Sequence, residues 1–241
     1  MRKHLWLLGF FIFLLALGTA GRLTAQCGVF RNCTDRDFRA MSAVIGYGSA
    51  RITNLGSTPD RVMRGVNARI DVHIVSLLLR GLPVRTYDAL IGDFTYGRRT
   101  SDSLPGLFAG DVEGTSGFQA TFGYQFLAGG QLGAFALLGG LGWQEYYHDI
   151  GGTTMSGTSI PLVARVEIFQ RKPIVVTAWK SMSGDPATGA RVDVPFFRRL
   201  MLTAAYWRAD GSADVWNNPS NTKTPGRASL LVLGFRTAEL Q

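Results

Sequence analysis

From about residue 40 onward, the chain is a series of short segments in which apolar and polar side chains alternate with a period of two. Between Phe118 and Leu127, aromatic or aliphatic residues occupy every second position, and Gln, Thr or Gly lie between them. Successive side chains of a β-strand point to opposite faces, so this pattern predicts a strand with one apolar and one polar face. Three further segments, beginning near Val66, Ser159 and Ala190, repeat the pattern.

Six less regular segments complete a predicted set of ten strands, with eight or twelve as the alternatives. They are residues 41–53, 84–97, 132–146, 173–181, 200–208 and 228–236. The segments suit transmembrane β-strands, which need about 9–11 residues. Asp88 and Asp93 have opposite parity, so a bulge near Gly92 is expected if both lie on one face.

The predicted connections alternate between short and long. The short ones are residues 80–83, 128–131, 171–173 and 197–199. The long ones are rich in Gly, Ser, Thr, Asn and Asp, and are residues 54–65, 98–117, 147–158, 182–189 and 209–227. Short turns on one side and long polar loops on the other are typical of an outer-membrane barrel. An even strand count returns both ends of the barrel to the periplasmic side.

The composition excludes several classes of protein. With 30 Gly, 46% hydrophobic and only 17% charged residues, the chain has ample apolar surface for folding, which argues against disorder. After the N-terminal segment no run of 18 apolar residues occurs, which excludes a helical membrane protein. The formal charge is +8, but the basic residues are scattered and no recognisable module is present, so we expect no nucleic-acid binding.

Residues 1–25 have the order of a secretory signal peptide. Arg2, Lys3 and His4 precede an apolar run from Leu5 to Leu17, and small residues follow up to Ala25. The run is shorter than the roughly 20 residues that span a bilayer, although an uncleaved anchor is the alternative. Export of the mature chain, with a periplasmic segment at residues 26–39, is therefore expected.

The only two cysteines, Cys27 and Cys33, follow the predicted cleavage region. In an oxidising periplasm they would close a small disulfide loop. Lipidation of Cys27 is the alternative, but Gln26 and Thr24 occupy positions where lipoprotein signals generally carry a small and an aliphatic residue.

The strand pattern and the turns of residues 40–237, together with the signal peptide that precedes them, resemble the small outer-membrane β-barrel family of Gram-negative bacteria. The segment from Ala228 to Arg236 looks like the closing strand that the barrel-assembly machinery reads in this family. In the family this strand usually ends on a C-terminal aromatic residue, whereas here six residues follow Phe235. The resemblance implies an all-β, antiparallel up-and-down transmembrane barrel in the outer membrane, with lipid and the assembly machinery as partners.

Charged side chains of both signs recur on the face opposite the aliphatic one. We expect seven of them to form an ion-pair network that fills the barrel interior: Arg69, Asp71, His73, Arg165, Glu167, Arg191 and Asp193. A charged group away from bulk water needs a partner, and ten strands leave an interior largely filled by side chains. A narrow polar path for small solutes is the alternative.

The one candidate catalytic pair is His148–Asp149, in the predicted loop 147–158. Some ten-stranded outer-membrane proteases use an Asp–His pair with further carboxylates, and Asp60, Asp102 and Asp111 lie in other predicted loops. A histidine titrates near neutral pH and can act as a general base. The rival interpretation is a solvated loop pair, and the chain has no nucleophile elbow, phosphate loop or metal-binding spacing.

The sequence therefore predicts an outer-membrane β-barrel with a largely plugged polar lumen and long surface loops. Its expected role is structural, adhesive or partner-binding, through an envelope or surface partner, and no cofactor or metal is expected. A narrow channel and a soluble secreted β-barrel or sandwich that binds a small ligand are the alternatives.

Overall fold

The computed structural model describes residues 41–53, 55, 60–75, 85–97, 116–168, 173–197, 200–215 and 223–237. The predicted signal peptide, the segment 26–39, the pair Cys27 and Cys33, and Asp102 and Asp111 all lie outside these described residues.

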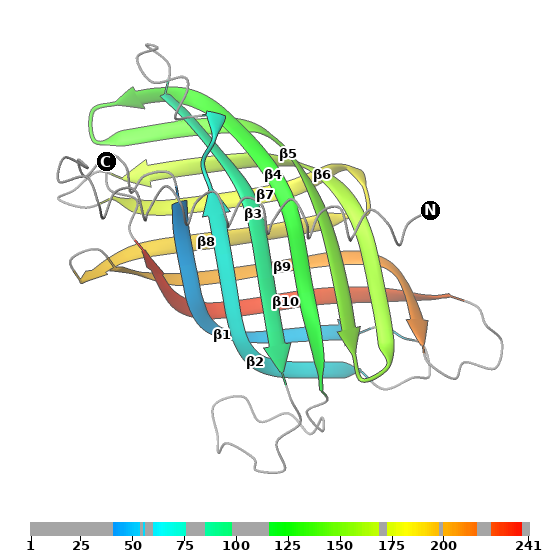
Figure 1. Cartoon of the computed structure of the whole chain (residues 1–241). Helices are drawn as coiled ribbons and strands as arrows, with labels where there is room; N and C mark the ends of the chain where they lie inside the picture. Colours follow the sequence, from blue (N-terminus) through cyan, green and yellow to red (C-terminus); the bar gives the residue numbers. More distant parts are fainter. Residues whose placement is uncertain are drawn as a thin grey trace.

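The described chain forms ten antiparallel strands that close into one barrel (Figure 1). Each strand pairs with the next in sequence, and β1 pairs with β10 to complete the circle. The strands are β1 (Met41–Thr53), β2 (Arg61–Val72), β3 (Arg85–Gly97), β4 (Gly117–Leu132), β5 (Phe135–Ile150), β6 (Thr153–Ile168), β7 (Ile174–Gly184), β8 (Ala187–Phe197), β9 (Leu200–Val215) and β10 (Thr224–Thr237). The predicted all-β, up-and-down barrel of ten strands is confirmed.

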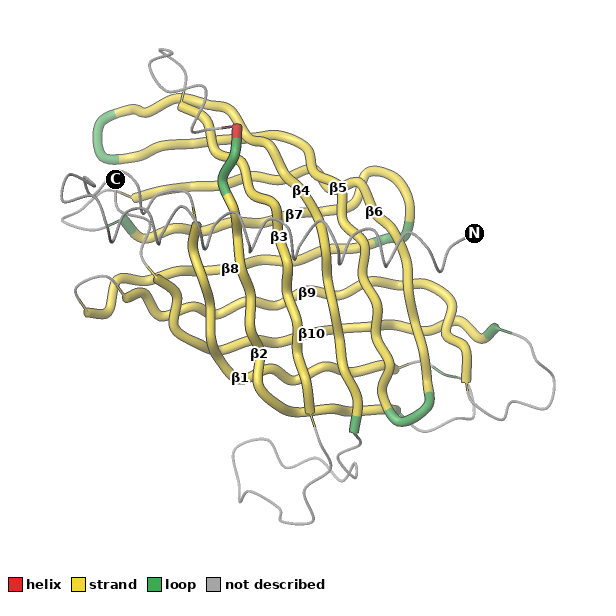
Figure 2. Tube along the Cα trace, in the orientation of Figure 1, coloured by secondary structure: helices red, strands yellow, loops and turns green. Residues whose placement is uncertain are grey.

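The trace in Figure 2 is almost entirely strand where it is described. Within the described residues, no helix is long and apolar enough to cross a membrane.

The barrel has two ends. We call the end at which β1 begins and β10 finishes the terminal end, and the opposite end the distal end. Strands β4, β5, β6 and β9 each have 16 residues, well beyond the roughly 9–11 that cross a bilayer.

Two of the five long connections predicted at the distal end are wrong. Most of residues 147–158 and 182–189, taken as long loops, belongs to strands. A two-residue turn, Gly151–Gly152, joins β5 to β6, and both glycines have positive φ (56° and 73°), as a tight hairpin turn requires. The Ser and Thr residues nearby are polar because they lie on strands beyond the apolar part of the wall.

At the terminal end, the turn predicted at residues 128–131 is also wrong. Strand β4 continues to Leu132, and the turn is Gly133–Ala134, with a φ of 58° at Gly133. The glycine pair Gly129–Gly130 mimics a turn in the sequence but belongs to β4. Pairing with β5 holds it extended.

The barrel narrows at its distal end. Strands β7 and β8 finish early, at the turn around Asp185 and Pro186, and β6 then pairs directly with β9. Met155 opposes Ala213, and Thr153 opposes Val215. Eight strands instead of ten therefore enclose the distal interior, and fewer strands enclose less space.

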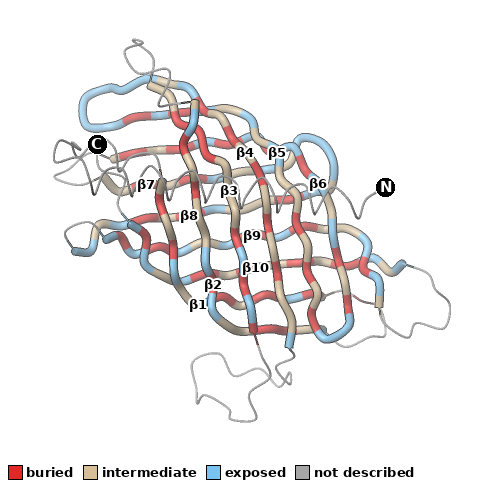
Figure 3. Tube along the Cα trace, viewed as in Figure 1, coloured by how far each residue is buried: buried red, intermediate tan, exposed pale blue. Residues whose placement is uncertain are grey.

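Buried and exposed residues alternate along the strands (Figure 3). The outward residues of the middle of the wall form what we call the apolar band. They are Gly, Ala, Val, Leu, Ile, Phe, Tyr or Trp at every position, and none is charged. The band covers residues 43–47, 66–72, 90–96, 118–128, 135–143, 160–168, 174–178, 190–196, 200–206 and 231–235.

The bulge expected near Gly92 is absent, because β3 pairs without interruption with both β2 and β4. Asp88 therefore has outward parity, yet it is fully buried. Its carboxylate accepts hydrogen bonds of 2.9 Å from the backbone N–H groups of Ile74 and Val75, just after β2. Asp88 thus accepts hydrogen bonds from backbone N–H groups that follow β2, and Asp93 is the aspartate of β3 that faces the interior.

Candidate functional site in the barrel interior

The terminal half of the interior holds six charged side chains that we call the ion-pair network. Its members are Arg69, Asp71, Asp93, Arg191, Asp193 and Arg236. Asp71 lies at its centre and accepts hydrogen bonds from three guanidinium groups, those of Arg69 (2.8 Å), Arg191 (3.1 Å) and Arg236 (3.2 Å).

Asp193 is the second anionic centre of the network. It lies 3.1 Å from Arg191 and 2.8 Å from Arg236, and it accepts a short hydrogen bond from the Thr203 hydroxyl. Asp93 completes the network through Arg69 at 3.9 Å and the Asn67 amide at 2.7 Å.

The network is buried and electrically balanced. The side chains of Asp71, Asp193, Arg191 and Arg236 are each at most 2% exposed. Charges removed from water are costly unless their partners compensate them, and here three arginines face three aspartates. The six residues therefore act as one unit, in which the loss of any member leaves an uncompensated charge.

A smaller ion-pair group lies on another part of the wall. Glu167 lies 2.7 Å from both Arg165 and Arg85. The Arg165 guanidinium also stacks over the Tyr87 ring, 3.9 Å from its centre. An arginine that pairs on one edge and stacks on its face is held in a single orientation.

Of the seven predicted lumen residues, the structure brings six into ion pairs, but in two groups. His73 lies apart: its Nδ1 makes a short contact with the backbone oxygen of Asp88, and its ring centre is 5.0 Å from that of Tyr87. Sequence reasoning missed Arg236, Asp93 and Arg85. The alternation of faces along β10 could have identified Arg236 as an inward residue, because it lies on the same face as Ala228, Leu230 and Val232.

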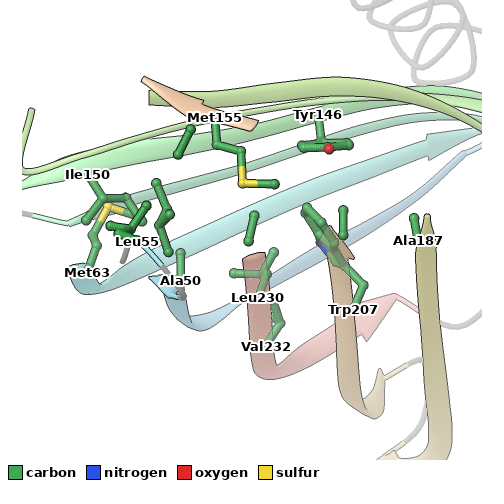
Figure 4. Packing of buried hydrophobic residues seen from close by; sticks show 14 residues of the cluster. Ala50, Leu55, Met63, Tyr146, Ile150, Met155, Ala187, Trp207, Leu230 and Val232 are labelled. Atoms are coloured by element: carbon green, nitrogen blue, oxygen red, sulfur yellow. The ribbon is translucent and has the colours of Figure 1, made fainter. Parts of the chain in front are cut away.

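The distal half of the interior holds a group of apolar side chains, which we call the distal cluster, beside buried polar residues such as Gln119, His148 and Thr153 (Figure 4). Tyr146 and Trp207 pack at a ring-centre distance of 5.5 Å, and Met155, Leu230 and Ile150 belong to the same cluster. Part of the cluster, including Met155 and Ala213, lies where β6 meets β9.

The structure does not bring together the predicted catalytic pair. His148 lies on β5, not in a loop, and points inward against Trp207 at a ring-centre distance of 5.2 Å. Asp149 points outward, because adjacent strand residues face opposite ways. His148 is fully buried, and neither of its ring nitrogens has a hydrogen-bond partner. Asp60, the other described carboxylate of the predicted site, is exposed just before β2.

Among the described residues, no group of three or more His, Cys, Asp or Glu could hold a metal ion. A cavity of about 40 Å³ lies where the ion-pair network meets the aromatic residues Trp179 and Trp207. Arg69, Asp93 and Arg191 contribute to its lining. It has room for only a few water molecules, and such polar pockets are commonly hydrated.

A scan of the sequence against protein-family models finds no match, and a search of curated proteins finds none either. Among solved structures, the chain is similar to Neisserial surface protein A, with 14% identity over 82% of this chain and 96% of that one and a TM-score of 0.35. It is also similar to the attachment invasion locus protein Ail of Yersinia pestis, with 14% identity over 81% and 97% and a TM-score of 0.28.

A third similar structure is the outer membrane protein OmpT of Vibrio cholerae, with 10% identity over 81% of this chain and 99% of that one and a TM-score of 0.20. These scores are low, and the strand pairing of the chain itself defines the fold.

The barrel differs from a soluble protein in burying a network of charges inside and exposing a continuous apolar band outside. Charges are buried inside, and large apolar residues such as Ile45, Leu137 and Phe235 are about half exposed or more outside. Only a closed barrel leaves no unpaired strand edge in lipid, and its lipid-facing side must be apolar. The closed ten-stranded barrel with its uncharged apolar band thus has the form that a transmembrane β-barrel requires.

Proposed function

We propose that this barrel is a plugged outer-membrane scaffold that conducts no solute and presents a binding face at its distal end. The observation that carries the proposal is the filling of both halves of the interior. Buried ion pairs such as Asp71–Arg236 occupy the terminal half, and the distal cluster around Trp207 occupies the other.

A solute would have to displace both fillings in turn. Separating a buried ion pair leaves two unpaired charges, and moving a packed aromatic residue opens a void. The cavity of about 40 Å³ between them does not amount to a continuous path. The arrangement therefore favours a plug over the alternative of a narrow channel.

The first experiment measures conductance in planar lipid bilayers after folding of the purified protein into vesicles. We expect no discrete current steps. Insertion is checked separately by carbonate extraction and by a gel-mobility shift between unboiled and boiled samples. Discrete steps from the inserted protein would contradict the plug and favour the channel, whereas carbonate release with one gel mobility would contradict the membrane location.

The distal end is the proposed binding face because its strands extend beyond the apolar band with polar residues. On β6, Thr154, Ser156 and Thr158 point outward above Ile160, the first apolar outward residue. In the proposed orientation both termini of the barrel face the periplasm, so this rim projects from the cell surface.

Site-specific photocrosslinking in whole cells tests the binding face. A photoreactive residue at Thr154 should yield adducts with protein or polysaccharide, whereas the same residue at Ile45, in the apolar band, should yield lipid adducts. Lipid adducts alone at both positions would contradict a binding role for the distal rim.

A further inference from the structure

The outer wall formed by β9, β10, β1 and β2 carries a groove of about 250 Å³. These strands lie side by side around the closure of the barrel (Figure 1). Tyr47 and Tyr206 flank the groove, and Leu231 and Leu233 line the part of it that lies nearer the terminal end. All four side chains belong to the apolar band, so this part of the groove suits an acyl chain.

The part of the groove nearer the distal end is cationic. Ser49 and Ser229 leave a hollow between larger neighbours, and Arg51 and Arg64 line its distal side. Arg51 and Ser229 are register partners, and so are Ser229 and Arg208. Arg51 and Arg208 therefore flank Ser229 from the two neighbouring strands, and their Cα atoms lie roughly 10 Å apart, since adjacent strands are about 4.8 Å apart.

The charge around the barrel rim is unequal. On β5, the first outward charges above the apolar band are acidic, Glu145 and Asp149. On β9, Asp210 lies one outward position beyond Arg208 and pairs with Arg227 at 2.5 Å. Arg51 and Arg208 thus form a cationic sector at the level where the apolar band ends and lipid headgroups would lie.

We propose that this groove binds a phosphate-bearing acyl lipid of the distal leaflet. Arg51 and Arg208 hold the phosphate, and the acyl chain lies along Leu231 and Leu233 between the two tyrosines. The guanidinium fork matches phosphate oxygens in a two-point contact, and Tyr side chains favour the boundary between headgroups and hydrocarbon. The proposal rests on the membrane location proposed above.

A second copy of the chain fits this face less well. Pairing of the same surface about a two-fold axis would bring the arginine sector of one copy toward that of the other, and like charges repel. An anionic amphiphile instead complements both the charge and the apolar floor.

Native mass spectrometry of the detergent-folded protein tests the site with dioleoyl phosphatidic acid as the probe. We expect one lipid to be retained per barrel. The double substitution Arg51→Ala, Arg208→Ala should weaken retention by about tenfold or more, because charge-assisted hydrogen bonds are lost. The Arg208→Lys variant keeps the charge but loses the fork, so it should give an intermediate loss.

Lys180→Ala is the matched control, since it removes an outward cation on β7, away from the groove. Equal retention by the wild type and the double variant, or an equal loss in Lys180→Ala, would overturn the proposal. Displacement of the lipid by millimolar inorganic phosphate would also overturn it, since the groove would then be a simple anion site. An unchanged boiled-versus-unboiled gel shift in each variant separates loss of lipid binding from loss of the membrane barrel.

Discussion

The two halves of the barrel interior solve one packing problem by different means. In the terminal half, ten strands surround the ion-pair network, and long arginine side chains reach aspartates on distant strands, as Arg191 on β8 reaches Asp71 on β2. In the distal half, β6 joins β9 and aromatic and aliphatic side chains fill the narrower space. The wide half thus combines long-reaching ion pairs with a smaller apolar group around Tyr87 and Leu138, whereas apolar side chains predominate in the narrow half.

The comparison teaches that the lumen wall of a membrane barrel is free to be either polar or apolar. Lipid constrains only the outer face, which carries no charge throughout the apolar band. Inside the barrel, each buried charge needs an ion-pair or hydrogen-bond partner, and each apolar side chain needs close packing contacts.

The largest expected effect comes from breaking the centre of the ion-pair network. Asp71→Leu removes the acceptor of three arginines, and the uncompensated buried charge should lower the free energy of unfolding by about 4 kcal/mol. Urea unfolding in detergent micelles, followed by tryptophan fluorescence, measures the change. Asp214→Leu, at an exposed distal position, is the control; a loss below about 1 kcal/mol for Asp71→Leu would mean that water already screens the network.

The distal cluster should respond to loss of volume instead. Leu230 is 1% exposed, and Leu230→Ala should cost about 3 kcal/mol through lost burial and a residual void. The same unfolding assay measures it, with Leu233→Ala on the lipid-facing side of β10 as the control. Similar losses for the two variants would show that the distal interior is not tightly packed.

A double-mutant cycle sharpens the contrast between pairing and packing. Arg236→Met leaves Asp193 its ion pair with Arg191, and Asp193→Leu leaves Arg236 its ion pair with Asp71, whereas the two together replace one ion pair with apolar groups and keep the charge balanced. We expect the double variant to be more stable than the sum of the single losses by about 2 kcal/mol. Simple additivity would indicate that Arg236 and Asp193 do not depend on each other.

The smallest effect concerns a glycine that makes room for the cluster. A Cβ at Gly189 would lie 2.2 Å from the Trp179 ring and 2.8 Å from the Trp207 side chain. Gly189→Ala should therefore cost about 1 to 2 kcal/mol through overpacking. Gly139→Ala is the matched control, because its Cβ would meet nothing within 4 Å; equal losses would contradict this account.

Much of the fold followed from the alternation of side chains. The period of two separated Phe118 and Ile160 from Gln119 and Arg165, and the barrel prediction then put the apolar pair outside, as the structure has them. The strand ends were harder to predict. Polar residues around Thr154 resemble a loop, because a strand that leaves the membrane loses its apolar side.

The candidate site was predictable residue by residue but not pair by pair. Parity alone placed Asp71 and Arg191 inside, yet their hydrogen bond joins residues 120 positions apart, and Asp71 and Arg236 are 165 apart. Contacts at such separation depend on the register of every strand and on the closure of the barrel. For the same reason, His148 and Asp149 looked like a pair although the strand turns them to opposite faces.

The sequence by itself predicted an all-β chain of about ten strands and sorted most side chains onto two opposite faces, because both follow from a local period of two. Only the tertiary structure decided which charges meet, where β6 takes β9 as a partner, and that the distal interior is apolar. These features depend on the distances across the closed barrel, and no local pattern in the chain encodes those distances.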